Sequence, residues 1–298
     1  MFTIKKTLSL FIVCFLLCFY KPILAEYKSD STNLKLNFYQ SIETKNLFYI
    51  ELKFKLLKDW HIYWKNPGEA GLPVSIDLTN NELNNKLIWP TPKSFKTGDL
   101  TSFGYDNTTS IYLPLMLEPN KKSYLLSGNI NWLVCKEECI PESYSFKENF
   151  RNPILKISDS KVNSITPIKL PFKSYLNKEK LHVSLDTFNL QKSPKFIYFY
   201  PDKNDKVDIS KQQSYNKDTN ELIISLKSIN NNDKLSGILT FNKRNSYQIL
   251  IEAPRQTNKV MSMIFFAFLG GILLNFMPCV FPVISIKALQ LINSEKKV

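Results

Sequence analysis

Hydrophobic and polar residues alternate along much of the first half of the chain. In residues 46–56, Ile50, Leu52, Phe54 and Leu56 occupy every second position, a period typical of a half-buried β-strand. No stretch before Val260 keeps a helical period over three turns. Similar alternation or short apolar runs predict further strands at 34–39, 74–78, 111–117, 124–134, 181–190, 196–200, 222–226, 235–241 and 247–251.

Turn-forming residues, such as Asn66, Pro67 and Gly68, separate these strands. Short strands that follow one another without intervening helices favour antiparallel sandwiches over a parallel α/β sheet. A polar interval interrupts the pattern in the middle of the chain. We therefore expect a mainly β protein with two immunoglobulin-like antiparallel β-sandwich units, at 26–150 and 181–256, joined by a linker at 151–180.

The N-terminus has the pattern of a secretory signal peptide. Lys5 and Lys6 precede an uncharged run at 8–20, and Ala25 offers a small residue for cleavage. This run is too short to span the ~30 Å hydrocarbon core of a bilayer as a permanent anchor. We therefore expect residues 1–25 to be a signal peptide and the following part to be exported.

The C-terminal region predicts a transmembrane segment at 260–287, followed by a cytoplasmic tail at 288–298. Residues 260–286 contain no charged side chain, but Pro278 and Pro282 interrupt them. Prolines free backbone carbonyls that lipid cannot satisfy, so such a helix normally packs against neighbouring helices. The segment is therefore expected to be the first helix of a larger membrane domain.

The formal net charge of +13 raises the question of nucleic-acid binding. The lysines are scattered among Asn, Ser and Asp, and no arginine stripe accompanies them. Nucleic-acid binding also fits poorly with export. We expect no nucleic-acid partner.

Two cysteines lie close together at the end of a predicted strand. Cys135 and Cys139 bracket a polar loop of three residues, Lys136, Glu137 and Glu138. In a continuous strand residues four apart lie ~13 Å from each other, beyond the ~4.4–6.8 Å Cα separation of a disulfide, so a bond requires a turn. A bond that closes so short a loop removes little entropy from the unfolded chain. Short, exposed disulfides are typically labile or catalytic.

Three interpretations of this pair compete. A structural disulfide fits an oxidising compartment. A zinc site would need two further ligands, and the only histidines are His61 and His182, so we expect no metal. Redox exchange is favoured, because Cys279 stands in an irregular Pro-Cys-Val-Phe-Pro sequence, although a lone buried cysteine is ordinarily a small hydrophobe.

Several segments resemble a known family. Residues 268–283, around Cys279, resemble the first membrane helix of the DsbD-type thiol:disulfide interchange proteins. Residues 59–73, 103–105 and 132–142 resemble the N-terminal region of the ScsB-like branch, which is linked to copper tolerance.

The resemblance implies an electron relay that needs no cofactor. In the family, cytoplasmic thioredoxin reduces a membrane disulfide, which reduces an exported pair. That pair then reduces periplasmic thiol-disulfide proteins, such as disulfide isomerases or cytochrome c maturation proteins. Carried over by motif, Cys135 and Cys139 are the exported pair and Cys279 is one of two membrane thiols, which implies an inner-membrane protein with most of its chain in the periplasm. Which of the paired cysteines attacks stays open.

Further residues are expected to support these cysteines. Pro141 closes the loop after Cys139, and Pro278 and Pro282 flank Cys279. The aromatic residues near the matched motifs either fill the core or cover the disulfide; they are Trp60, Tyr63, Trp64, Tyr105 and Trp132.

A second class of function stays open, a membrane-anchored binding or assembly protein with a purely structural disulfide. The relay needs two membrane thiols, whereas this sequence supplies only Cys279 and no second apolar span. We therefore expect a fragment, a split-gene product or a non-functional truncated remnant. A separately encoded membrane half with several helices is the corresponding expected partner.

Overall fold

The structure of the chain is a computed structural model. Several expected features lie outside the residues that it describes. They are the signal peptide with Cys14 and Cys18, the segment with Pro278, Cys279 and Pro282, and nearly all of the cytoplasmic tail. The described residues are 26–79, 86–151, 154–164, 166–167, 172–188, 194–228, 233–242, 245–252, 260–275, 287 and 289–290.

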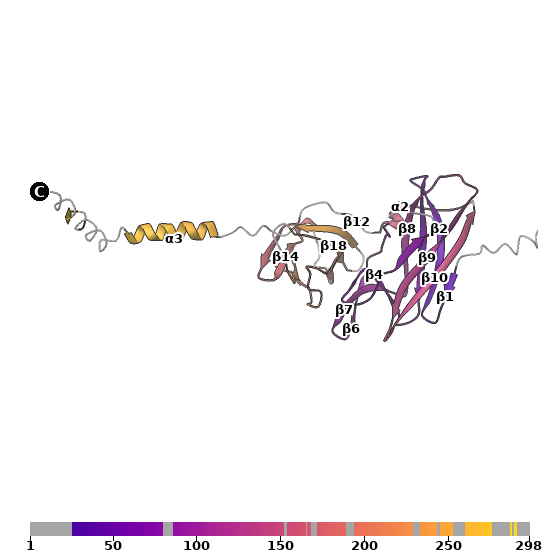
Figure 1. Cartoon of the computed structure of the whole chain (residues 1–298), viewed down its shortest axis with the longest axis horizontal. Coiled ribbons are helices and arrows are strands. Elements are labelled where there is room, and N and C mark those ends of the chain that lie inside the picture. Colours follow the sequence, from indigo (N-terminus) through magenta and orange to yellow (C-terminus); the bar gives the residue numbers. More distant parts are fainter. Residues whose placement is uncertain are drawn as a thin grey trace, which may run out of the picture. The chain divides into compact units, whose positions relative to one another are not determined.

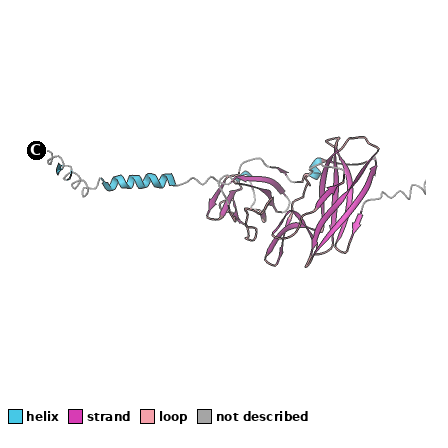
Figure 2. Cartoon of the chain, viewed as in Figure 1, coloured by secondary structure: helices cyan, strands magenta, loops and turns pink. Residues whose placement is uncertain are grey.

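The first half of the β-rich region consists of two sheets (Figures 1 and 2). Sheet A has the order β1-β2-β3-β8, with β11 pairing β2. Its strands are β1 (Glu26–Lys28), β2 (Thr32–Ser41), β3 (Leu47–Leu56), β8 (Thr108–Met116) and β11 (Leu155–Ile157). Sheet B has the order β10-β9-β4-β7-β6, with β5 pairing β9. Its strands are β4 (His61–Gly68), β5 (Ser75–Leu78), β6 (Lys93–Thr97), β7 (Leu100–Asp106), β9 (Ser123–Cys135) and β10 (Cys139–Arg151).

Sheets A and B pack face to face through aromatic side chains. Phe54 of β3 meets Trp132 of β9 edge to face, with ring centroids 5.5 Å apart. Phe48 of β3 lies 4.9 Å from Tyr124 of β9. The alternation seen in the sequence therefore directs one face of each sheet into a shared core, and burying these rings is the main driving force for the sandwich.

The second half of the β-rich region has two four-stranded sheets. Sheet C has the order β12-β19-β18-β15 and sheet D the order β13-β14-β17-β16. Phe188, in the 3₁₀ turn η1 (Asp186–Phe188), packs against Phe241 and Tyr247 of sheet C. The strands are β12 (Thr166–Pro167), β13 (Ser174–Asn177), β14 (Lys180–Ser184), β15 (Ile197–Pro201), β16 (Ser214–Asn216), β17 (Glu221–Ser225), β18 (Lys234–Phe241) and β19 (Asn245–Glu252).

The expectation of a mainly β, antiparallel protein is confirmed; the parallel pairs among the described strands are β11 with β2 and β12 with β19. The structure differs from the expected elements in several places. Strands that were not expected include β4, β6, β7, β10 and β16. Residues 151–180, expected as a linker, contain β11, α2 (Asp159–Val162), β12 and β13, which are too short to show a period. The strand expected at 181–190 ends at Ser184. Asn66, Pro67 and Gly68 lie inside β4, at an irregularity in its pairing with β7, where Gly68 has a φ of 92°.

Strands β4 and β7 make contacts between the two halves; on β7, Phe103 meets Tyr198 and Tyr200 edge to face. The Asn66 side-chain amide donates to the Pro201 carbonyl (2.7 Å) and to Asn204 Oδ1 (2.8 Å), and the Asn204 amide donates back to the Gly68 carbonyl. Trp64 lies edge to face with Tyr200, with centroids 6.4 Å apart. The described residues up to Glu252 accordingly form one compact unit, and those from Val260 on belong to another.

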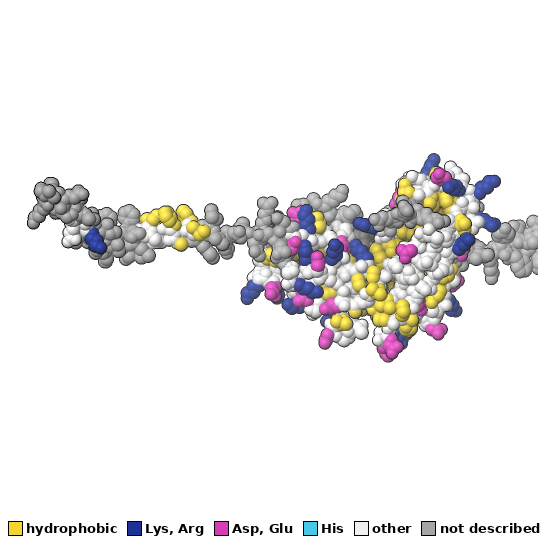
Figure 3. Space-filling view, viewed as in Figure 1, with side chains coloured by type: hydrophobic (Ala, Val, Ile, Leu, Met, Phe, Trp, Pro, Cys, Tyr) yellow, Lys and Arg dark blue, Asp and Glu magenta, His cyan; other side chains and the backbone are white. Residues whose placement is uncertain are grey.

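The second unit contains the helix α3 (Val260–Asn275). Its described side chains are mostly apolar and exposed, whereas basic and acidic side chains intermix on the face of the β-rich unit that Figure 3 shows. In the described part of the chain, no helix combines the length and apolarity needed to cross a membrane.

Candidate redox site

A disulfide joins the two strands of the β9–β10 hairpin at its tip. Cys135 ends β9, Cys139 begins β10, and the two are directly paired across the strands. The Lys136 backbone N–H donates to the Glu138 carbonyl (3.1 Å), so the three-residue loop makes the turn that the cysteine spacing requires. The Cα atoms of the cysteines lie 4.1 Å apart.

The two cysteines of the disulfide differ sharply in their exposure to solvent. Cys135 is only 2% exposed, whereas Cys139 is exposed to solvent. This difference follows from their places in sheet B, because β9 is flanked by β10 and β4 while β10 is the edge strand. A thiol approaching from solution therefore meets Cys139 first.

Side chains of β4 and β6 cover the buried side of the disulfide. The Tyr63 hydroxyl donates to Cys135 Sγ at 3.0 Å and lies 3.7 Å from Cys139 Sγ. His61, paired with Cys135 across the strands, stacks on Phe95 with centroids 4.8 Å apart and meets Tyr63 edge to face. The disulfide thus has one open side and one side covered by Tyr63, with His61 beside it and Phe95 stacked on the His61 ring.

The groups that cover the disulfide are uncharged near neutral pH. Burial raises the pKa of the Tyr63 hydroxyl, so that it keeps its proton. Burial lowers the pKa of the His61 imidazole, although the Asp106 carboxylate opposes this shift. Cys135 is therefore covered by a hydrogen-bond donor and a neutral imidazole.

The loop that follows β4 holds the Tyr63 ring in place. Tyr63 forms an isolated bridge with Pro73, and Gly71 has a φ of 107°. A Cβ atom on Gly71 would lie 2.2 Å from Cε1 of the Tyr63 ring. Only glycine therefore lets the loop pass so close to this ring.

Glu142, three residues from Cys139, ties the disulfide end of the hairpin to sheet A. Its carboxylate accepts hydrogen bonds from Ser29 Oγ (2.7 Å), Ser31 Oγ (2.6 Å) and Trp132 Nε1 (2.9 Å). Ser29 and Ser31 lie between β1 and β2. Three donors satisfy a half-buried carboxylate, and this arrangement fixes the distance of the hairpin from the opposite sheet.

The structure brings one of the expected supporting aromatic residues to the disulfide, Tyr63. Trp60, Trp64 and Trp132 pack into or against the core, and Tyr105 donates to the Pro90 carbonyl. Pro141 is exposed on β10.

Sequence reasoning missed His61 and Phe95 as parts of this site. His61 was detectable, since it is two positions from Tyr63 and therefore on the same face of the strand. Phe95 carries no such signal, because its stacking depends on the pairing of β6 with β7, far along the chain from Cys135.

Comparison with known proteins agrees with this geometry. Residues 35–151 match the family described as thiol:disulfide interchange protein DsbD, N-terminal. This region is a DsbD-type N-terminal domain. The DsbD-type domain contains Cys135, Cys139 and all three covering rings, and together with the disulfide it supports a thiol:disulfide exchange module.

The fold also matches a solved structure, the N-terminal periplasmic domain of ScsB from Proteus mirabilis. The TM-score is 0.60 at 17% sequence identity, over 78% of this chain and 98% of that chain. This coverage extends beyond the DsbD-type domain, so the shared fold includes part of the second half. A comparison with curated proteins found no significant match.

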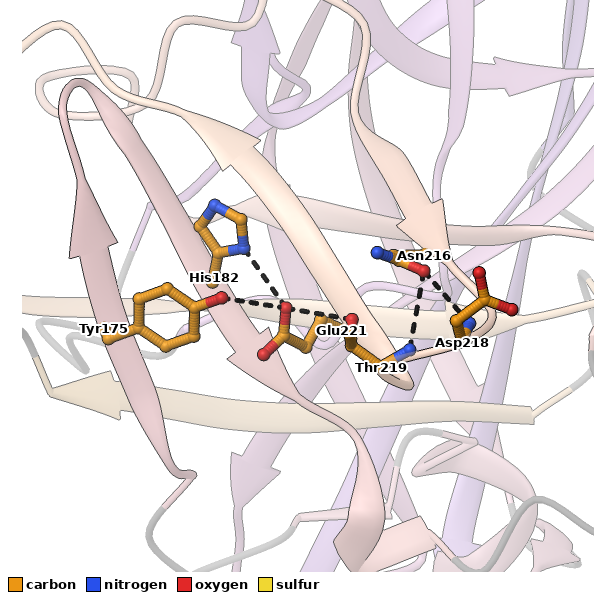
Figure 4. A network of polar contacts seen from close by, with 6 residues as sticks. All are labelled: Tyr175, His182, Asn216, Asp218, Thr219 and Glu221. Atoms are coloured by element: carbon orange, nitrogen blue, oxygen red, sulfur yellow. Dashed lines mark hydrogen bonds and ion pairs between the residues drawn. The ribbon is translucent and has the colours of Figure 1, made fainter.

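A separate polar cluster lies on sheet D (Figure 4). Glu221 accepts hydrogen bonds from Tyr175 (3.1 Å) and Thr219 (3.0 Å), and its Oε2 lies 3.2 Å from His182 Nδ1. Burial tends to raise the pKa of Glu221, but hydrogen bonds from His182, Thr219 and Tyr175 together lower it. His182 is therefore engaged away from the disulfide, and no group of three or more His, Cys, Asp or Glu residues in the described ranges could hold a metal ion.

We predict that Gly71→Ala destabilises the protein more than Gly98→Ala does. Both glycines have a positive φ, but a Cβ at Gly98 meets nothing within 4 Å. Gly98, with a φ of 61°, lies in the left-handed region that other residues can adopt, whereas Gly71, with a φ of 107°, lies outside it. The Gly71 variant also adds overpacking against Tyr63, which typically costs about 1–3 kcal/mol. Urea denaturation of the two variants measures the difference, and equal midpoints would contradict the close approach.

We also predict that the free energy of unfolding falls as the pH is lowered from about 6.5. The pKa of His61 is lower in the folded protein, so below the unfolded value the unfolded chain binds a proton more readily. A His61→Phe variant, which can still stack on Phe95, should lose part of this decline, and His182→Phe should keep it. Denaturation midpoints between pH 7.5 and 5 measure the effect, and an unchanged decline in His61→Phe would count against the buried neutral imidazole.

Proposed function

We propose that the exported part of this chain is the periplasmic thiol:disulfide exchange module of a membrane electron relay. The observation that carries this proposal is the asymmetry of the disulfide in a DsbD-type domain, with Cys139 exposed and Cys135 covered by Tyr63. A bond used only as a staple has no need of one accessible sulfur.

The exchange runs through a mixed disulfide. A donor thiolate attacks Cys139 Sγ, the bond between Cys135 and Cys139 breaks, and Cys135 leaves as a thiolate. The Tyr63 hydroxyl, 3.0 Å from Cys135 Sγ, donates a hydrogen bond to this leaving sulfur. A second donor thiol then displaces Cys139, which leaves the donor oxidised and the pair reduced by two electrons. The same steps in reverse reduce an acceptor disulfide.

The proposal also includes the donor and the acceptors of the electrons. The donor is a membrane domain in the inner membrane, to which Cys279 contributes one thiol and a second membrane cysteine contributes the other. Cytoplasmic thioredoxin supplies the electrons. The acceptors are periplasmic thiol-disulfide proteins that serve disulfide isomerisation, cytochrome c maturation or copper tolerance.

A redox titration separates this function from a structural disulfide. We expect the Cys135–Cys139 disulfide of the full chain, solubilised in detergent, to have a reduction potential above about −300 mV when it is titrated with glutathione or dithiothreitol buffers. Alkylation of free thiols followed by mass measurement reports the reduced fraction. A pair that stays oxidised below that potential would be structural, and the exchange function would be lost.

Single cysteine variants test which sulfur receives the attack. In Cys135→Ser the remaining Cys139 thiol is exposed, so we expect it to react with iodoacetamide at least about tenfold faster than the buried Cys135 thiol of Cys139→Ser. The unfolded variants in urea serve as controls and should react at similar rates. Faster reaction of Cys135 in the folded protein would reverse the roles.

A further inference from the structure

The strand that begins at Cys139 has an unpaired edge. Among the described strands, β10 pairs only with β9, and its 13 residues lie at the end of sheet B. Most of its alternate side chains, including Cys139, Pro141 and Ser143, are exposed. A long free edge is a template for pairing with an extended segment of another chain.

The geometry at the disulfide shows which backbone groups this edge presents. The Cα separation of 4.1 Å between Cys135 and Cys139 is close to the ~4.5 Å of a non-hydrogen-bonded antiparallel pair, not to the ~5.5 Å of a hydrogen-bonded one. The N–H and C=O of Cys139 therefore point toward the free edge, as do the backbone groups of Pro141 and Ser143, two and four residues on. A proline fits this phase, because its missing N–H is not needed for pairing with β9.

A groove lies on the same face of the sheet as the disulfide. It has a volume of about 370 Å³, and its lining includes Leu72, Pro73, Asn131, Leu133, Pro141 and Ser143. Leu133 and Pro141 are paired across the strands two positions from Cys135 and Cys139, so all four side chains project from one face. Leu72 is 65% exposed although it is apolar. The groove therefore lies on the face of the disulfide and includes the residue pair two positions along the hairpin from it.

The opposite side of the disulfide is acidic. Glu137 and Glu138 are exposed in the hairpin loop. The positive charge of the third loop residue, Lys136, is offset by Asp59, since Lys136 Nζ lies 3.8 Å from Asp59 Oδ2. The surface therefore changes from acidic at the loop, through the disulfide, to apolar at the groove. A complementary ligand carries a basic residue on one side of its cysteine and an apolar residue on the other.

We propose that this surface docks an extended, cysteine-containing segment of the redox partner. The segment pairs with the free edge of β10, which places its cysteine beside Cys139. A long apolar side chain two residues from that cysteine lies next to Pro141 and reaches over it into the groove. A lysine or arginine on the other side faces Glu137 and Glu138. This inference rests on the proposed function and assigns its specificity to the groove.

Activated peptides test the proposal on the full chain in detergent, in the Cys135→Ser background. The probes are Lys-Gly-Cys-Gly-Phe and Phe-Gly-Cys-Gly-Lys, each with its cysteine linked to 2-nitro-5-thiobenzoate, and the same two peptides with Ser in place of Phe. The Cys139 thiolate attacks the peptide sulfur, the bond to nitrothiobenzoate breaks, and the coloured thiolate that leaves reports the rate. We expect Phe to accelerate the reaction about fivefold or more in one of the two orientations.

Two leucine variants show whether the groove causes this preference. Leu72→Glu should reduce the ratio of the Phe and Ser rates to about one. The matched control is Leu125→Glu, which puts the same charge at a leucine that is 61% exposed on β9, ~30 Å along the strand from Cys135. The Leu125→Glu variant should keep the ratio of the Phe and Ser rates of the Cys135→Ser background.

Two outcomes would overturn the inference, namely equal rates for Phe and Ser peptides in both orientations, or a preference that survives Leu72→Glu. A separate arm uses cysteine amide activated in the same way, which has no side chain for the groove. It should react equally with all variants, and if Cys139 does not react even with this probe, the exchange function itself fails.

Discussion

The pairing of β9 with β10 is the interaction on which the rest of the site depends. Its register runs without a break from Cys135 opposite Cys139 to Ser123 opposite Arg151. Because side chains alternate between the faces of a strand, a slip of one residue would turn Trp132 out of the core and Leu133 into it. The same slip would separate the cysteines. The hydrogen bond from Trp132 to Glu142 and those from Ser29 and Ser31 oppose such a slip by tying the hairpin to sheet A.

Strand β4 connects this hairpin with the second half of the β-rich unit. Its first residues, His61 and Tyr63, cover the disulfide, and Asn66, near its end, is bound by the segment at 201–204. The second half contributes no side chain to the described contacts of the disulfide. Its contacts instead hold the strand that supplies the covering rings, so support of β4 is the structural role that these contacts assign to it.

The chemistry of the site follows from exposure more than from charge. Neutral groups cover Cys135 on its buried side, and a tyrosine whose pKa is raised by burial stays available as a hydrogen-bond donor. Cys139 lies on an edge strand, where a partner can approach both its sulfur and its backbone. One bond thus joins a protected sulfur to an accessible one, and a hydroxyl is already placed at the sulfur that leaves.

The sequence by itself determined strands such as β3, β9 and β18, because period-two alternation records which face of a strand is buried. It did not determine β4 or β10, which cover and carry the disulfide. It also placed Cys135 and Cys139 on either side of a turn, since no extended chain can bond residues four apart. Only the tertiary structure decided which cysteine is exposed, because that depends on β4 lying beside β9 and on β10 lying at the edge. The stacking of Phe95 on His61, the passage of Gly71 over Tyr63 and the exposure of Leu72 beside Leu133 likewise arise from segments that are distant in the chain. Their physical basis is strand order and register, which hydrophobic periodicity within a single strand does not specify.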